Sequence, residues 1–200
     1  ANQEKILWGM LSENTAPEAM KLMEFNPEKI NLYWLSRNPT IGAITVLEAN
    51  QGHEQIDWCW LSRNPSAIEL LEANQDRISW YRLSENPSPG AIKLLEANPE
   101  KINWEWLSAN TAPNAIKLLE ANPEKIDWEY LSLNPSAIKL LEANQKKIDW
   151  INLSRNPAPG AIKLLEANPE KIVWNILSVN FAPGAIKLLE ANQEKINWDM

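Results

Sequence analysis

The sequence predicts an all-α fold, a right-handed α-solenoid in which each repeat contributes a helix and a second, shorter helix. Three observations lead to this prediction. Nearly the same segment recurs at a step of 24 residues with one step of 22, apolar residues recur at helical spacing within each copy, and nothing shows the period of two that a half-buried strand requires. A regular step of this kind is typical of stacked repeats, because a single copy cannot bury its own apolar face.

The recurrence fills the whole chain, and we expect a single repeat domain over residues 1–200. The asparagine of the E-A-N segment marks the phase of each copy. This phase gives eight full repeats and part of a ninth: 1–24, 25–48, 49–72, 73–96, 97–120, 121–142, 143–166, 167–190 and 191–200.

Local signals justify each element of a repeat, as in 97–120. Asn103 is a residue type whose side chain accepts the N–H groups of a first helical turn, so we expect a short helix, called helix B, over 104–108. A second helix, called helix A, begins at Pro113 and ends at Asn122, since proline suits a first turn and asparagine tolerates the left-handed conformation that closes helices. The Asn-Pro-Glu-Lys-Ile segment that follows predicts a turn or a single 3₁₀ turn. A capping residue of this kind precedes the first residue of helix B in seven copies, tryptophan in six of them and Leu32 in the other: Asn31, Asp57, Ser79, Asn103, Asp127, Asp149 and Asn197.

Length changes between copies fall in the predicted loops. Two repeats lack a dipeptide before helix A and read Asn-Pro-Ser-Ala at 64–67 and 134–137. One copy carries an extra Gly52-His53 in the turn after helix A. Insertions and deletions cost little in loops, which supports the assignment of the helices.

Composition excludes several classes of protein. A hydrophobic content of 44% favours a folded core over disorder, no apolar run approaches the roughly 18 residues of a membrane span, and no signal peptide is visible. The formal charge of −7 makes a nucleic-acid backbone a poor partner, because phosphates attract a basic stripe. The one cysteine, Cys59, rules out an internal disulfide and suits a reducing compartment.

The run N-P-S-A-I-K-L-L-E at 134–142, followed by K-I-D-W-I-N-L-S at 147–154, resembles a tandem repeat of predicted proteins from large algal DNA viruses. The resemblance covers essentially the whole chain, although most copies here carry two residues more than the 22-residue unit of that family. The chain is more loosely similar to leucine-rich-variant repeats, which alternate a helix with a shorter helical turn. Neither resemblance implies a chemistry, and the near-identity of the A-I-K-L-L-E-A-N blocks also fits an engineered or regularised array.

One aromatic position recurs as a ladder. Stacking on nucleic acid requires aromatic residues that alternate with cations, whereas the flanking residue here is mostly Asp or Asn. Leu32 occupies the position in one repeat, and an apolar replacement keeps packing but would destroy a ligand cage. We interpret this tryptophan ladder as buried inter-repeat core, with partner contact as the alternative: Trp8, Trp58, Trp80, Trp104, Trp128, Trp150, Trp174 and Trp198.

A serine and, two residues later, an asparagine recur in every full repeat. A catalytic serine requires one base and one acid rather than eight equivalent copies, and a single histidine leaves no triad. We therefore expect these side chains to satisfy backbone groups at helix ends and in loops. The serines are Ser12, Ser36, Ser62, Ser84, Ser108, Ser132, Ser154 and Ser178.

Other conspicuous residues point to no chemistry. His53 and Cys59 have no further His or Cys to complete a zinc site, so we expect no metal, no cofactor and no catalytic residue. A glutamate ends each helix A, where a negative charge opposes the helix dipole. We interpret these glutamates as structural brackets, with a carboxylate-lined binding strip as the alternative: Glu24, Glu48, Glu72, Glu96, Glu120, Glu142, Glu166 and Glu190.

The positions that differ between repeats lie on one face of helix B. They are the residue after each ladder position and the residue four further along, a spacing that places each pair on the same face, away from the Trp and Leu side. Tyrosine and arginine in the middle repeats are common in interface hot spots. This variable strip is either a neutral surface or a partner-binding surface, with candidate residues Tyr33, Arg37, Cys59, Arg63, Tyr81, Glu85, Glu105, Glu129, Ile151 and Arg155.

We expect a non-enzymatic scaffold that presents an extended protein-binding surface along helix B. The alternative is a structural assembly protein, viral or part of a lattice or filament, that associates end to end. Apolar residues such as Ile6 and Ile196 keep the interior pattern at both ends, which predicts a segment of a longer array or contact between the ends of neighbouring molecules. Expected partners are a protein or a second copy, with no nucleic acid, membrane or small-molecule substrate, and the expected location is the cytoplasm or a virion.

Overall fold

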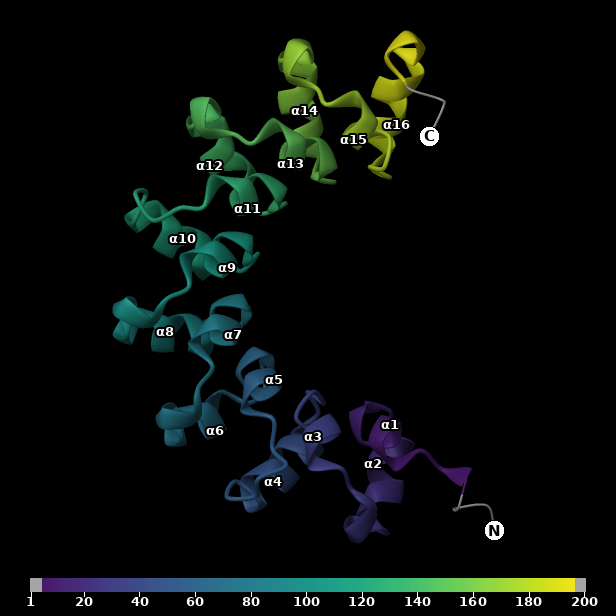
Figure 1. Cartoon of the computed structure of the whole chain (residues 1–200), viewed down its shortest axis with the longest axis vertical. Helices are drawn as coiled ribbons and strands as arrows, with labels where there is room; N and C mark the ends of the chain where they lie inside the picture. Colours follow the sequence, from purple (N-terminus) through teal and green to yellow (C-terminus); the bar gives the residue numbers. More distant parts are fainter. Residues whose placement is uncertain (1–4, 197–200) are drawn as a thin grey trace. The chain divides into compact units, whose positions relative to one another are not determined.

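Helix pairs repeat along the chain. The computed structural model describes residues 5–196, which contain helices and turns and no strand (Figure 1). Contacts between residues divide the chain into two compact units, the N-terminal unit Ala1–Ile102 and the C-terminal unit Asn103–Met200, and we describe each by itself. The predicted all-α solenoid of short helix pairs is confirmed. A single repeat domain over 1–200 stays a prediction.

The N-terminal unit contains four described helix pairs. Its helices B are α1 (Trp8–Glu13), α3 (Leu32–Leu35), α5 (Trp58–Arg63) and α7 (Trp80–Glu85). Its helices A are α2 (Pro17–Glu24), α4 (Ile41–Ala49), α6 (Ile68–Ala73) and α8 (Pro89–Ala97). Single 3₁₀ turns follow three of them, η2 (Pro27–Lys29), η3 (Gln75–Arg77) and η4 (Pro99–Lys101).

The C-terminal unit repeats this arrangement. Its helices B are α9 (Trp104–Ala109), α11 (Trp128–Leu133), α13 (Trp150–Arg155) and α15 (Trp174–Leu177). Its helices A are α10 (Pro113–Ala121), α12 (Ile138–Ala143), α14 (Pro159–Ala167) and α16 (Pro183–Glu190), and its 3₁₀ turns are η5 (Gln145–Lys147), η6 (Pro169–Lys171) and η7 (Gln193–Lys195). Within each unit, like helices lie beside like: α5 packs against α7, α6 against α8, α11 against α13 and α12 against α14 (Figure 1).

The predicted caps form at most helices B. The side chains of Asn31, Asp57, Asn103, Asp127 and Asp149 each accept an N–H group of the first turn. Ser79 occupies the same position before α7, but its side chain makes no capping hydrogen bond. Asn197 lies outside the described residues.

The asparagine that ends helix A acts differently from the prediction. Asn122 has φ −133° and ψ 61°, so it is not left-handed as expected. Its Nδ2 instead donates to the carbonyl of Leu118 at 2.8 Å, which satisfies one of the acceptors left open at the end of a helix. The same side-chain bond closes the other helices A, through Asn26, Asn50, Asn74, Asn98, Asn144, Asn168 and Asn192.

The core consists of leucines rather than tryptophans. The leucine three residues after the ladder position is completely buried in seven repeats, and Leu11 after Trp8 is half-buried: Leu35, Leu61, Leu83, Leu107, Leu131, Leu153 and Leu177 are the buried ones. Helix A adds a second buried row at the last leucine of A-I-K-L-L-E, such as Leu119 and Leu141. The isoleucine before each cap adds a third, such as Ile126.

The tryptophan ladder is half-buried, which corrects the prediction of a buried ladder. Trp8, Trp58, Trp80, Trp104, Trp128, Trp150 and Trp174 all keep part of their surface open to solvent, and Trp198 lies outside the described residues. Their rings lie beside the turn that follows helix A, where a cation covers several of them. Lys101 lies 4.7 Å from the Trp80 ring centroid, Lys147 lies 4.9 Å from Trp128, and Arg77 lies 5.2 Å from Trp58.

Serine side chains connect each helix B to the next repeat. The Oγ–H of Ser36 donates to the carbonyl of Leu32 at 2.8 Å, and the same oxygen accepts the N–H of Asp57 at 3.0 Å. This pair of bonds confirms that the recurring serines satisfy backbone groups. It recurs at Ser12, Ser62, Ser108, Ser132 and Ser154.

Buried asparagines make the second connection. The Nδ2 of Asn64 donates to the carbonyls of Ser36 at 3.3 Å and Asn38 at 3.0 Å in the preceding repeat, while its Oδ1 accepts the N–H of Ser66 at 3.1 Å. The same three bonds are made by Asn38, Asn86, Asn134 and Asn180. Helix B is therefore held in register with its neighbours, which fixes the position of the surface that it exposes.

Candidate protein-binding surface

Helix B turns its variable strip toward solvent in both units. The residue after each ladder position is exposed at all six candidate sites: Tyr33, Cys59, Tyr81, Glu105, Glu129 and Ile151. Among the strip residues four positions further along, Arg63 and Arg155 are exposed, whereas Arg37 and Glu85 are partly buried. The predicted strip thus lies on the surface, and two of its charged groups are covered by their neighbours.

Trp60 in α5 is surrounded by three arginines. The guanidinium of Arg37 lies 4.2 Å from the Trp60 ring centroid, that of Arg82 lies 5.4 Å away and that of Arg63 lies 5.9 Å away. Cations attract the negative face of an aromatic ring, so these contacts restrain long side chains that would otherwise be mobile.

Arg37 links two neighbouring helices B. Its guanidinium also lies 4.6 Å from the ring of Trp34 and 5.7 Å from that of Tyr33, while Trp34 and Tyr33 meet edge to face at 5.6 Å. Its Nη1 lies 3.8 Å from the carboxylate of Glu13. Arg37, in the turn that follows α3, is therefore held against α3 and α5 at the same time.

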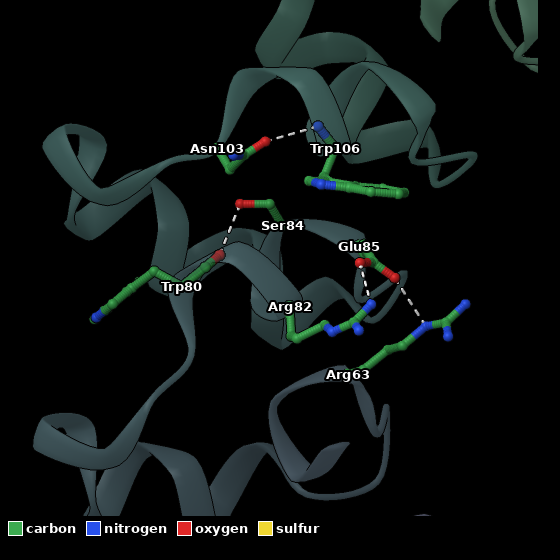
Figure 2. A network of polar contacts seen from close by, with 7 residues as sticks. All are labelled: Arg63, Trp80, Arg82, Ser84, Glu85, Asn103 and Trp106. Carbon is green, nitrogen blue, oxygen red and sulfur yellow. Dashed lines mark hydrogen bonds and ion pairs between the residues drawn. The ribbon is translucent and has the colours of Figure 1, made fainter. Parts of the chain in front are cut away.

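Glu85 in α7 joins two more arginines (Figure 2). Its carboxylate accepts a hydrogen bond from Arg82 at 2.8 Å and lies 3.0 Å from Nε of Arg63, which belongs to α5. The Glu85 side chain is 9% exposed, whereas that of Arg63 is 51% exposed. Hydrogen bonds with Cys59 and then with Glu85 raise the pKa of Arg82 above its ordinary value, against a smaller opposing effect of burial.

These contacts define one group of side chains, which we call the aromatic–arginine cluster: Tyr33, Trp34, Arg37, Trp60, Arg63, Tyr81 and Arg82. Tyr33 and Tyr81 are each 42% exposed, so the rings present apolar surface to solvent beside three cations. The Nε atoms of Arg37 and Arg82 are buried and have no hydrogen-bond partner among the described residues. Unsatisfied buried donors destabilise a fold, so stability alone does not account for this arrangement.

The strip of the C-terminal unit has a different character. The rings of Trp106 and Tyr130 lie 5.5 Å apart at an angle of 54°. A hydrogen bond with Glu105 raises the pKa of Tyr130 above its ordinary value, with further contributions from burial and from the charges of Glu105, Glu129 and Asp127. On α9 and α11, aromatic rings beside the strip are combined with carboxylates rather than with arginines.

Sequence reasoning missed the second residue after each ladder position. Trp34, Trp60, Arg82, Trp106 and Tyr130 all occupy it. Trp34, Trp60, Arg82 and Tyr130 contact strip residues, and Trp106 packs against Tyr130. A signal was present, because the chain has 11 tryptophans and the ladder accounts for eight of them. The other three share this one position, which marks a second aromatic row.

The structure also shows the surroundings of the glutamates that end helices A and of His53. The glutamates that end helices A are exposed, and no hydrogen bond or ion pair of their carboxylates occurs in the described part of the chain, so the bracket interpretation is wrong. The asparagines that follow them close the helices instead. His53 is exposed, and its Nδ1 accepts the N–H of Gln55 at 3.2 Å within the inserted turn.

Metal-binding and membrane-spanning features were also sought. Among residues 5–196, no group of three or more His, Cys, Asp or Glu side chains is arranged to hold a metal ion. None of the helices in the same range has the length and apolar character needed to cross a bilayer.

Comparisons with known proteins give no relative. No protein-family model matches the chain, and no curated protein and no solved structure matches it. The regular tandem array of helix pairs rests on the structure itself, and the resemblance to the viral repeat stays a prediction.

Proposed function

We propose that this chain is a non-enzymatic repeat scaffold that binds a protein partner through the aromatic–arginine cluster on α3, α5 and α7. The proposal rests on the surroundings of Trp60. Three guanidinium groups are held close to its ring, between the exposed tyrosines Tyr33 and Tyr81. Restrained tyrosine, tryptophan and arginine side chains lose little entropy on binding, which is why they dominate interface hot spots.

The charge of the cluster favours an acidic, partly apolar segment as partner. Three arginines face two carboxylates, Glu13 and Glu85, whereas the whole chain carries a formal charge of −7. The cluster is therefore a positive surface on a negative protein, and it steers acidic segments toward itself. The exposed rings of Tyr33 and Tyr81 offer contact area to apolar side chains of the same segment.

A peptide selection tests this proposal without a known partner. Random peptides displayed on phage are selected on the full chain, and we expect enrichment of peptides that combine Asp or Glu with an apolar residue. Affinity for the selected peptide falls at least tenfold in the triple variant Tyr33→Ala/Arg63→Ala/Tyr81→Ala, with an unchanged circular dichroism spectrum.

The matched control changes the same rows in the C-terminal unit, Glu105→Ala/Glu129→Ala/Ile151→Ala, and it leaves the affinity within twofold. If the two triple variants bind the peptide equally well, or if enriched peptides are neutral or basic, the assignment of the binding surface is refuted.

End-to-end association is a second candidate function, in keeping with the viral resemblance. Apolar side chains near the limits of the described residues are open to solvent: Leu7, Met10, Val179, Phe181 and Ile186. Phe181 is 88% exposed in the loop before α16. Light scattering across a hundredfold concentration range checks this candidate, which requires a mass that grows with concentration and returns toward one chain in Phe181→Ser/Ile186→Ser.

A further inference from the structure

Four residues, three in the repeat at 25–48 and one in the turn that follows it, depart from the other repeats at positions that surround one cavity. Leu32 stands where other repeats have the ladder tryptophan, and Gln55 stands where other repeats have the Lys or Arg of the following turn. In helix α4, Val46 replaces a leucine, and Thr45 replaces the residue that is lysine in most copies. Each replacement is shorter than the residue it replaces, so the four changes together remove side-chain volume and two positive charges from one place.

The structure has a cavity of about 590 Å³ at this place. Leu32 and Leu35 of α3 line it, together with Met20 and Met23 of α2 and Val46 of α4. Binding sites for small molecules have volumes of roughly 300–1,000 Å³ and mostly apolar walls. The cavity is therefore of the size and character that a flat organic ligand requires.

The polar groups at the cavity favour a positive charge. Glu24 and Glu28 line it, and neither carboxylate has an ion-pair partner among the described residues. No lysine or arginine lines it, because Thr45 and Gln55 occupy the positions where other repeats supply a cation. His53 of the inserted turn also lines the cavity.

Neighbouring repeats show what normally fills this position. In the repeats that follow, the indole of Trp58 is paired with Arg77, and that of Trp80 with Lys101. Each pair combines an aromatic ring with a cation at about 5 Å. At Leu32 and Gln55 both members of the pair are absent, while the carboxylates of Glu24 and Glu28 remain.

We propose that this cavity binds a small arylalkylamine, a ligand whose flat ring takes the place of the missing indole and whose ammonium group takes the place of the missing cation. The ring packs on Met20, Ile30 and Val46, which line the cavity and keep part of their surface open, and the ammonium group pairs with Glu24 and Glu28. The site shares no residue with the aromatic–arginine cluster, so it stands independently of the proposed protein-binding function.

Tryptamine is the probe, measured by isothermal titration calorimetry on the full chain. We expect saturable binding at one site with a Kd of about 1 mM or tighter, within reach of a ligand of this size. Indole-3-acetate, which has the same ring and the opposite charge, binds at least tenfold more weakly, because it meets Glu24 and Glu28. Butylamine, which has the charge without the ring, also binds at least tenfold more weakly.

Two variants test whether a loss of tryptamine binding comes from a change at the cavity or from a loss of the fold. Leu32→Trp/Gln55→Lys restores the pair found in other repeats and fills the cavity, so tryptamine binding is lost, and the thermal unfolding midpoint shows whether the variant folds. Glu24→Gln/Glu28→Gln keeps the cavity and lowers tryptamine affinity at least tenfold. Its matched control, Glu96→Gln/Glu100→Gln, changes the equivalent residues of another repeat and leaves the affinity within twofold.

Three results would overturn the proposal: no saturable tryptamine binding by the unaltered chain, equal binding of tryptamine and indole-3-acetate, or an affinity that is unchanged in Glu24→Gln/Glu28→Gln. Retained binding in a folded Leu32→Trp/Gln55→Lys variant places the ligand elsewhere and has the same consequence.

Discussion

At the scale of single residues, five asparagines of the L-S-x-N segments, Asn38, Asn64, Asn86, Asn134 and Asn180, make three hydrogen bonds while almost completely buried. Asn134 is 2% exposed and holds the carbonyls of Ser108 and Asn110 in the repeat before it. Its Oδ1 also accepts the N–H of Ser136. A buried amide with every partner in place both stabilises the stack and fixes its register, since any shift would leave several polar groups unpaired.

Replacing Asn134 with alanine tests this role. Asn134→Ala leaves two carbonyls and one N–H group without a partner, at about 1 kcal/mol each, so we expect it to lower the free energy of unfolding by about 3 kcal/mol. The matched control is Asn144→Ala, because the half-buried Asn144 makes one side-chain bond, to Leu140 at the end of α12. Urea denaturation should give a loss of about 1 kcal/mol or less for the control. Similar losses in both variants would show that the bonds between repeats do not contribute as described.

Sequence reasoning went part of the way to these residues. It predicted that the recurring serines and asparagines satisfy backbone groups, because eight equivalent copies suit structure better than catalysis. It did not predict that Ser36 bonds to Asp57 or that Asn64 reaches Ser36, since a pattern within one repeat does not state which neighbouring atoms it meets. For the same reason the ladder tryptophans were predicted to be more buried than they are, because hydrophobicity alone does not show which part of a ring is exposed to solvent.

At the scale of the elements, helix B begins where the sequence predicts and the strength of its cap varies. The Asp127 side chain accepts the N–H of Tyr130 at 3.1 Å, whereas Ser79 makes no capping bond. We expect Asp127→Ala to cost about 1 kcal/mol and Ser79→Ala less than about 0.5 kcal/mol. Thermal unfolding of the two variants checks the difference, and a larger loss for Ser79→Ala would contradict the capping assignment.

Four helices A carry a glycine in their first turn: Gly42, Gly90, Gly160 and Gly184. A Cβ atom at Gly90, near the start of α8, would lie 2.6 Å from Cγ2 of Ile68 in α6. Alanine normally favours a helix over glycine by about 1 kcal/mol, but here the branched isoleucine cannot move away easily. We expect Gly90→Ala to destabilise the fold by about 1–3 kcal/mol, as overpacking does, while Gly52→Ala in the open turn changes stability by less than about 0.5 kcal/mol. A more stable Gly90→Ala variant would mean that α6 and α8 are not packed this closely.

At the scale of the whole molecule, the residues that build the stack are separate from those of the proposed binding surface. Leucines, serines and asparagines that recur in each copy build the stack, so helix B can carry different residues on its exposed face without loss of the fold. The sequence predicted both helices of the repeat and the exposed position of the strip, because these follow from local pattern. It missed Trp34, Trp60 and Arg82, whose importance depends on contacts between repeats that the spacing of one repeat does not contain.

Hydrogen exchange of the full chain with and without the selected acidic peptide tests the central claim most directly. Binding at the aromatic–arginine cluster slows exchange of the backbone amides in α3, α5 and α7, because occupancy suppresses local opening of these short helices. Amides in α9, α11 and α13 keep their rates. Protection confined to the C-terminal unit, or spread evenly over both units, would contradict the claim that this cluster is the binding surface.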